Sequence, residues 1–434
     1  MLAAKVLYKS FYWKAFQFFI SFLINIVFVR IFQSAVTAEF YSLIYLLSFA
    51  IVFFTLGLDI SLNYFISKKQ LSPGNASRII ITIVLLALLI CLPLLYFLYQ
   101  PVQYPDMSSG DFILFSFFYI AGGLLSVLSS AIFTAYDQNY LPTIVSVIVG
   151  CAVLFVSLIL ITVSKDTAIV RTLFVIYFIS TFFQGLLLFG YSYWLYHKRQ
   201  LVQAVQNIRL KKIIQFSFFA FFTNLIFFAG TRICVFIIPY WADPAAVGNY
   251  IQAFKIVEYI EVFVSFIYYP FIAIIATRND EKTKEYVLLI VRISNTFVLI
   301  ISILLLIFGR FLFPIIFGGS FTEMYSVFVW LIPGLFAACA STFFTAYYFG
   351  IGNSKYNFTS ACILLLSMLI LFFLLVRVFG ITGAAIAFSS ASLFSLIYDG
   401  IIFKRFFTYR FREVLFIRKS DLADIIKFIK QNLK

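Results

Sequence analysis

The chain has 434 residues, of which 63% are hydrophobic and only 11% are charged. This composition excludes a water-soluble globular protein, because soluble domains carry about 25% charged residues. Without water in the bilayer core, the backbone must satisfy its own hydrogen bonds, which leaves helices or closed barrels. The long charge-free runs exclude a barrel, whose strands would alternate polar and apolar residues. The sequence therefore predicts an all-α, polytopic membrane protein.

Apolar stretches of the length needed to cross a bilayer, about 20 residues each, recur along the chain. They predict twelve transmembrane helices, at about residues 15–37, 40–66, 79–99, 112–135, 141–163, 172–196, 213–240, 247–277, 286–308, 324–350, 356–379 and 383–403. The first of them is too long for the apolar region of a cleavable signal peptide. We therefore expect it to be retained.

A polar and basic stretch at residues 197–212 divides the helices into two sets of six. Short motifs echo between the sets, such as Thr-Ala-Tyr at residues 134–136 and 345–347. The sequence thus predicts two pseudo-symmetric six-helix lobes, at 1–196 and 213–403, joined by a cytoplasmic linker at 197–212. Residues 404–434 form a basic cytoplasmic tail, either an amphipathic helix on the membrane surface or a frayed end. Parallel repeats of this kind are typical of transporters with a substrate path between the lobes.

Positive charges concentrate in alternate loops, which sets the expected orientation. Lys68, Lys69, Arg78, the linker and the tail fall on one side, whereas the other side has few basic residues and the acid Glu39. Both termini are therefore predicted to be cytoplasmic. The net charge of +15 then faces anionic membrane lipids, and no nucleic-acid partner is needed to explain it.

Arg171, Arg292, Arg310 and Arg377 lie toward helix ends and are interpreted as interface anchors. Three other basic residues lie inside predicted helices, where a charge costs about 3 kcal/mol. Arg30, Arg232 and Lys255 are candidate cations for an anionic headgroup, because a guanidinium donates two parallel hydrogen bonds to phosphate. Alternatives remain for each of them. Arg30 lies near a helix end and can extend to the outer headgroups, and Lys255 can form an intrahelical salt bridge with Glu258.

Three acidic residues within helices are candidate coupling or structural acids: Asp59, Glu258 and Glu261. The spacing of Lys255, Glu258 and Glu261 places successive members on one helix face. Asp59 can instead pair with Lys68 or cap a neighbouring helix. These residues complete the set of site candidates.

The sequence predicts no catalytic residues, no cofactor and no metal. Its five cysteines lie in apolar runs without metal-ligand spacing, and its one histidine, His197, has no second ligand nearby. No phosphate-binding GxxxxGK[ST] motif occurs, and no loop is long enough for a soluble domain. We therefore expect a transporter and not an enzyme.

Several segments, in chain order, resemble those of a known family. They are AEFYSL at 38–43 with GL at 57–58, AVGNY at 246–250, FPIIFG at 313–318, YFGIGNSK at 348–355 and FGITGAAIA at 379–387. Together they resemble the polysaccharide flippases of the Wzx-like branch of the MOP transporter superfamily. Tyr41 departs from this pattern, since a glycine is common there, which loosens the expected turn between the first two helices.

The resemblance implies a flippase of the bacterial cytoplasmic (inner) membrane. Such proteins move undecaprenyl-pyrophosphate-linked oligosaccharides, the repeat units of O-antigen (lipopolysaccharide) or capsule, from the cytoplasmic to the outer leaflet by alternating access. The implied partners are the lipid-linked oligosaccharide, a polysaccharide polymerase and a chain-length regulator. The alternatives are a MOP-type antiporter of another substrate and a membrane glycan polymerase, although the short outer loops argue against a polymerase.

Overall fold

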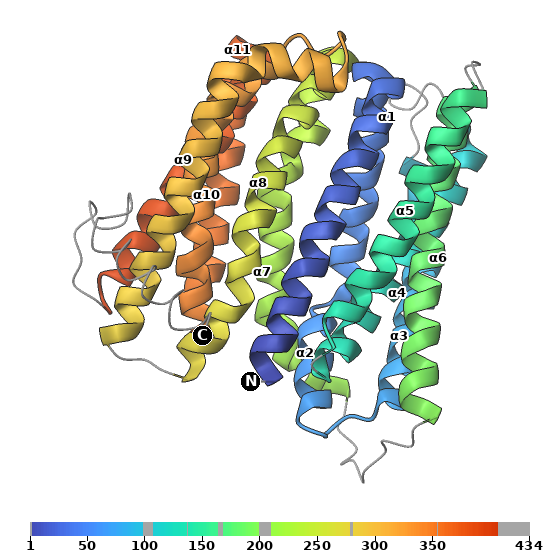
Figure 1. Ribbon diagram of the computed structural model, residues 1–434, viewed down its shortest axis with the longest axis vertical. Coiled ribbons are helices and arrows are strands. Elements are labelled where there is room, and N and C mark those ends of the chain that lie inside the picture. Colours follow the sequence, from blue (N-terminus) through green and yellow to red (C-terminus); the bar gives the residue numbers. More distant parts are fainter. Residues whose placement is uncertain are drawn as a thin grey trace. The chain divides into compact units, whose positions relative to one another are not determined.

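The computed structural model describes residues 2–98, 107–136, 138–163, 168–198, 210–277, 281–353 and 355–406. Most of the predicted linker and the predicted amphipathic tail lie outside the described residues. Within these ranges all regular structure is helical (Figure 1). The helices are α1 (Leu2–Thr55), α2 (Leu58–Ser67), α3 (Pro73–Leu98), α4 (Ser109–Ala135), α5 (Tyr140–Val163), α6 (Ala168–Lys198), α7 (Leu210–Ile237), the short η1 (Ile238–Tyr240), α8 (Pro244–Thr277), α9 (Glu281–Phe317), α10 (Met324–Gly350) and α11 (Lys355–Phe403).

Two of these helices contain a break and therefore cover two predicted spans each. The backbone leaves the helical region at Gln33 in α1 (φ 57°) and at Gly380 in α11 (φ 57°). In the described part of the chain, nine segments are long and apolar enough to cross a membrane, and those within α1 and α11 are 45 and 49 residues long. A length of about 20 residues crosses once, so each of these two crosses twice. With α8, 34 residues long, the helices match the twelve predicted spans and confirm an all-α, multi-pass membrane protein.

The turn between the first two spans is not where the sequence predicted it. We expected a loop near residues 38–39, with Glu39 on the outer surface. Instead the break falls at Gln33, and the chain is helical again from Ser34. The backbone N–H of Ser34 donates to Ser320 Oγ at 3.1 Å, which replaces a hydrogen bond that the break removes. Glu39 is consequently buried within a helix, at 6% exposure.

The chain forms two compact units. Unit 1 contains Met1–Phe236 and Ile316–Ser320, and unit 2 contains Ile237–Ile315 and Phe321–Lys434. In the most apolar window of both α4 and α10, 56% of residues are buried, against 17–28% in the other apolar segments. In unit 1, α4 packs against α1, α2, α3, α5 and α6, and in unit 2, α10 packs against α8 and α11. Each unit is thus built around the fourth predicted helix of its half. The predicted lobe boundaries at 197–212 stay a prediction.

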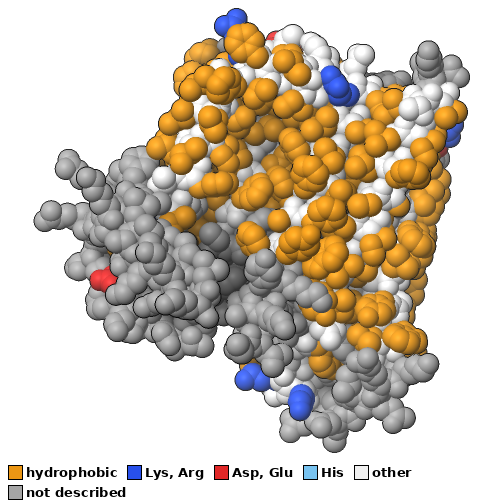
Figure 2. Space-filling view, viewed as in Figure 1, with side chains coloured by type: hydrophobic (Ala, Val, Ile, Leu, Met, Phe, Trp, Pro, Cys, Tyr) orange, Lys and Arg blue, Asp and Glu red, His pale blue; other side chains and the backbone are white. Residues whose placement is uncertain are grey.

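Large apolar side chains cover the outer faces of the helices. On α3, Leu89 and Phe97 are 77% and 82% exposed, and on α9, Phe311 is 70% exposed. Figure 2 shows hydrophobic side chains over most of the coloured surface, with Lys and Arg toward the helix ends. Such a surface is stable only in lipid, because contiguous apolar patches of this extent are rare on soluble proteins.

Candidate functional site

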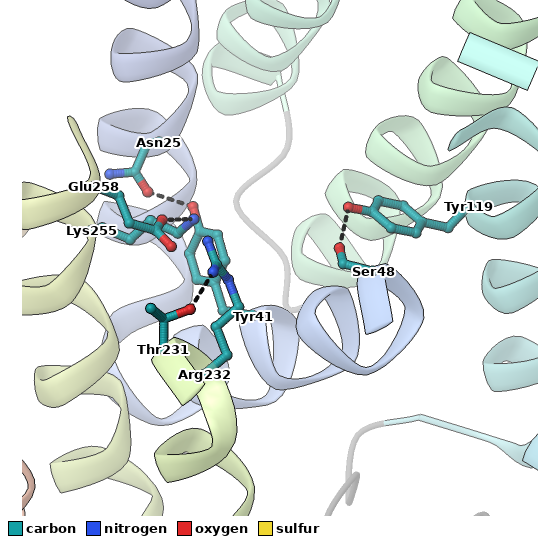
Figure 3. A network of polar contacts seen from close by, with 8 residues as sticks. All are labelled: Asn25, Tyr41, Ser48, Tyr119, Thr231, Arg232, Lys255 and Glu258. Atoms are coloured by element: carbon teal, nitrogen blue, oxygen red, sulfur yellow. Dashed lines mark hydrogen bonds and ion pairs between the residues drawn. The ribbon is translucent and has the colours of Figure 1, made fainter. Parts of the chain in front are cut away.

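Arg232 lies toward the C-terminal end of α7, within an apolar membrane-spanning segment of unit 1. Its Nη1 atom donates to Thr231 Oγ1 at 2.8 Å (Figure 3). Its Cζ atom lies 4.7 Å from the ring centre of Phe228 and 5.5 Å from that of Tyr45 in α1. A cation over an aromatic face is attracted to it, with an energy that grows when water is excluded. The protein therefore holds this guanidinium in place at an apolar position.

The second half of α1 supplies polar groups on the same unit. Tyr41 donates its hydroxyl proton to Asn25 Oδ1, which ties the two halves of α1 together across the break at Gln33 (Figure 3). The ring of Tyr41 also lies 6.3 Å from that of Tyr45, centre to centre. The contacts therefore run from Asn25 through Tyr41 and Tyr45 to Arg232.

Four tyrosines gather beside this row, and we call them the tyrosine cluster: Tyr41, Tyr45, Tyr119 and Tyr177. The rings of Tyr119 and Tyr177 stack at 6.4 Å, and the ring of Phe40 contacts both Tyr41, at 5.2 Å, and Tyr177, at 5.1 Å. Tyr119 also shares a hydrogen bond of 3.1 Å with Ser48 (Figure 3). The tyrosines come from α1, α4 and α6, so their grouping could not be read from spacing along the chain.

The Tyr41–Asn25 hydrogen bond predicts a specific loss of stability. Tyr41→Phe removes the donor from a buried amide, and an unsatisfied buried polar group costs about 1–3 kcal/mol. We expect a lower apparent melting temperature for the purified variant. Tyr240→Phe is the matched control, since Tyr240 is 71% exposed. Equal behaviour of the two variants would show that the buried bond contributes nothing.

In unit 2, α8 carries the predicted charged face. Lys255 Nζ lies 2.7 Å from Glu258 Oε2, with 17% and 15% of the two side chains exposed. The structure therefore contains the intrahelical salt bridge that the spacing allowed. Glu261 lies one turn further along α8, the helix that packs against α10.

The remaining two predicted site residues lie in unit 1. Arg30 is exposed in the first half of α1, just before the break. Asp59 lies in the first turn of α2, where the helix dipole favours an acid. The preceding Leu56 and Gly57 have left-handed backbones, with φ of 49° and 67°, which separates α2 from α1. No ion pair joins Asp59 to Lys68 in the described chain, so the structure does not contain that alternative pairing.

Two buried charged residues were missed as site candidates. Asp399 in α11 is 0% exposed, and its backbone carbonyl accepts a hydrogen bond from Tyr348 Oη. The sequence did mark Asp399, because it is the one acid inside the predicted span 383–403. Arg292 in α9, interpreted as an interface anchor, is only 7% exposed. Among the described residues, no three His, Cys, Asp or Glu side chains are grouped as metal ligands.

Comparison with solved structures identifies the fold. The inward closed conformation of the lipid II flippase MurJ matches with a TM-score of 0.70 and 14% identity, covering 99% of this chain and 92% of that one. A MOP-superfamily transporter from Pyrococcus furiosus, whose binding pocket has reversed polarity, matches with a TM-score of 0.70 and 13% identity over 93% and 96% of the chains. A point mutant of the Vibrio cholerae MATE transporter VcmN matches with a TM-score of 0.64 and 16% identity over 93% and 96% of the chains.

The fold is that of the MOP-superfamily transporters. The match extends over nearly the full length of both chains, so it includes both units and not one repeat alone. No protein-family model matches the sequence, and no curated protein matches it. At 13–16% identity the likeness establishes the fold, while substrate and partners must be argued from the site.

Proposed function

We propose that this protein is a flippase that moves a polyprenyl-pyrophosphate-linked oligosaccharide, an O-antigen or capsule repeat unit, across the inner membrane by alternating access. The observation that carries the proposal is Arg232, a guanidinium held in an apolar span by a hydroxyl and two aromatic rings. Guanidinium forks bind phosphate oxygens in pairs. The MOP fold supports transport, and one protein that shares it is a lipid II flippase.

The tyrosine cluster provides groups that can bind the sugars of such a substrate. Phenol rings offer flat apolar faces and hydroxyls that donate and accept hydrogen bonds. A sugar has the same mixture of apolar C–H faces and hydroxyl groups. Arg232 contacts the tyrosine cluster at Tyr45, which in turn contacts Tyr41, so one site in unit 1 provides groups for a pyrophosphate and for sugars. Arg30 and Lys255 remain secondary candidates for headgroup binding.

Arg232→Ala tests this function in a deletion strain complemented with the variant. We expect surface polysaccharide to fall by about tenfold or more, since charge-assisted hydrogen bonds contribute about 1.5–3 kcal/mol. Lipid-linked units should accumulate in the cells while the variant still inserts in the membrane. Arg232→Lys keeps the charge but loses the fork, and it should retain part of the export. Surface polysaccharide at the wild-type level in Arg232→Ala would refute the role of this cation.

The same deletion strain separates export from polymerisation. Loss of a polymerase leaves single repeat units on the cell surface, whereas loss of a flippase leaves none. We expect none. This outcome would also agree with a pathway in which a polymerase and a chain-length regulator act after this protein.

A further inference from the structure

Unit 1 contains a pocket of about 340 Å³ beside the break in α1. Its lining comes from Met107, just before α4, and from three helices, including Val36 and Glu39 from α1, Asp111 and Phe115 from α4, and Arg171 and Phe174 from α6. This volume lies at the lower end of the range for small-molecule sites, about 300–1,000 Å³. The pocket therefore suits a single small ring and not a whole oligosaccharide.

Two phenylalanine rings form a fixed apolar surface in the pocket. Phe115 stacks on Phe178 with ring centres 4.9 Å apart, and Phe174 meets the ring of Phe40 edge to face at 4.8 Å. Both lining rings are almost fully buried by these neighbours, so each presents only a small area to the pocket. Because the rings are held on several sides, the surface is formed before any ligand arrives.

Three charged groups complete the lining, and two of them hold each other. Arg171 Nη2 donates to Asp111 Oδ1 at 2.8 Å, and Ser108 Oγ donates to Asp111 Oδ2 at 2.9 Å. The Arg171 side chain is 69% exposed, which places it at the mouth, whereas Glu39 is buried. The pocket thus offers carboxylate acceptors and guanidinium donors side by side over an aromatic surface.

This mixture argues against two classes of ligand. An apolar molecule would remove water from the carboxylates without replacing its hydrogen bonds, which is costly. Two carboxylates against one guanidinium repel an anion, whereas they attract a cation, which is therefore the competing ligand. A neutral molecule with many hydroxyl groups both donates to the carboxylates and accepts from Arg171. We propose that this pocket binds one sugar ring.

The position of the pocket in unit 1 indicates a role for sugar binding. This role rests on the proposed function. The pocket lies where α4 and α6 begin, at helix ends that the distribution of Lys and Arg assigns to the outer side of the membrane. A sugar held there belongs to a headgroup that has crossed. The pocket then acts as an exit subsite, separate from Arg232.

Ligand-observed saturation-transfer NMR on the purified full-length protein in nanodiscs tests the proposal. The probes are glucose, galactose and N-acetylglucosamine, with choline as the cationic comparison. We expect millimolar binding of at least one sugar. Glu39→Gln should weaken it by about tenfold, the effect of losing one charge-assisted hydrogen bond. Val36→Phe should abolish it by filling the pocket while keeping every charge.

Two further variants serve as controls. Arg377→Ala removes an exposed arginine from unit 2 and should bind sugar normally. Arg232→Ala should also bind sugar normally while export fails, so the pocket and the proposed function can fail independently. Sugar binding that is absent, or unchanged in both pocket variants, would overturn the proposal. Binding of choline in place of all three sugars would overturn it as well.

Discussion

Gly185→Ala is expected to prevent α6 from packing against α4 and to leave little folded protein. A Cβ atom at position 185 would lie 2.3 Å from the carbonyl oxygen of Gly122 and 2.7 Å from its Cα atom. The contact is reciprocal, because a Cβ atom at position 122 would lie 2.4 Å from the carbonyl oxygen of Thr181. These neighbours are backbone atoms, so no rotamer change can relieve the overlap. The two helices would have to separate.

The size of the effect follows from the position of α4. Overpacking a core costs about 1–3 kcal/mol when side chains can adjust, and a backbone overlap lies at the upper end, about 3 kcal/mol. Because α4 is the most buried helix of unit 1 and contacts five others, its displacement disturbs the whole unit. Size-exclusion chromatography of detergent extracts measures this as a several-fold smaller monodisperse fraction and a lower melting temperature.

Gly190 provides a control on the same helix. A Cβ atom there meets no atom within 4 Å. Gly190→Ala should therefore behave as wild type or fold slightly better, since alanine favours a helix by up to about 1 kcal/mol over glycine. If both substitutions lower the folded fraction equally, the loss comes from α6 itself and not from its packing on α4.

The contact between Gly122 and Gly185 also shows what the sequence could not reveal. Hydropathy places the spans well, because lipid imposes about the same length on every helix that crosses it. The break at Gly380 likewise has a sequence signal, since glycine readily adopts a positive φ. Which glycines meet across two helices is a property of tertiary packing, and no local pattern distinguishes Gly185 from Gly190.

The break at Gln33 has no comparable local signal. The backbone there has a φ of 57°, which is unfavourable for a residue other than glycine. The break is supported by Ser320, whose hydroxyl accepts from the Ser34 N–H across a sequence separation of 286 residues. The sequence therefore predicted a turn in this region but placed it a few residues late. As a result Glu39 was assigned to a loop and its place in the pocket was missed.

The candidate site was predictable in its charges and not in its neutral members. Arg232 and Lys255 stood out because charged residues are rare in spans. Asn25 and the tyrosines did not, because tyrosine is common near membrane interfaces and 27 are present. Their significance comes from α1 folding back on itself at Gln33, which brings Tyr41 to Asn25.

The second large expected effect concerns the pair on α8. Glu258→Ala leaves the Lys255 ammonium, 17% exposed, without the carboxylate at 2.7 Å. A charge within a span costs about 3 kcal/mol, and the Glu258 carboxylate offsets part of that cost, so we expect a marked loss of folded protein. Glu258→Gln, which keeps a hydrogen-bond acceptor without the charge, should show a smaller loss. The measurement is the melting temperature of the purified protein.

The reversed pair Lys255→Glu/Glu258→Lys separates a structural role from substrate binding. It keeps one charge of each sign three residues apart and places glutamate before lysine, the better order along a helix. Stability should therefore return to near the wild-type value. The positive charge moves by only about 4.5 Å along the axis, and the pair stays neutral, so we expect export to survive. A reversed protein that folds normally but exports no polysaccharide would instead indicate that Lys255 contacts the anionic headgroup. The double substitution changes only where the positive and the negative charge lie.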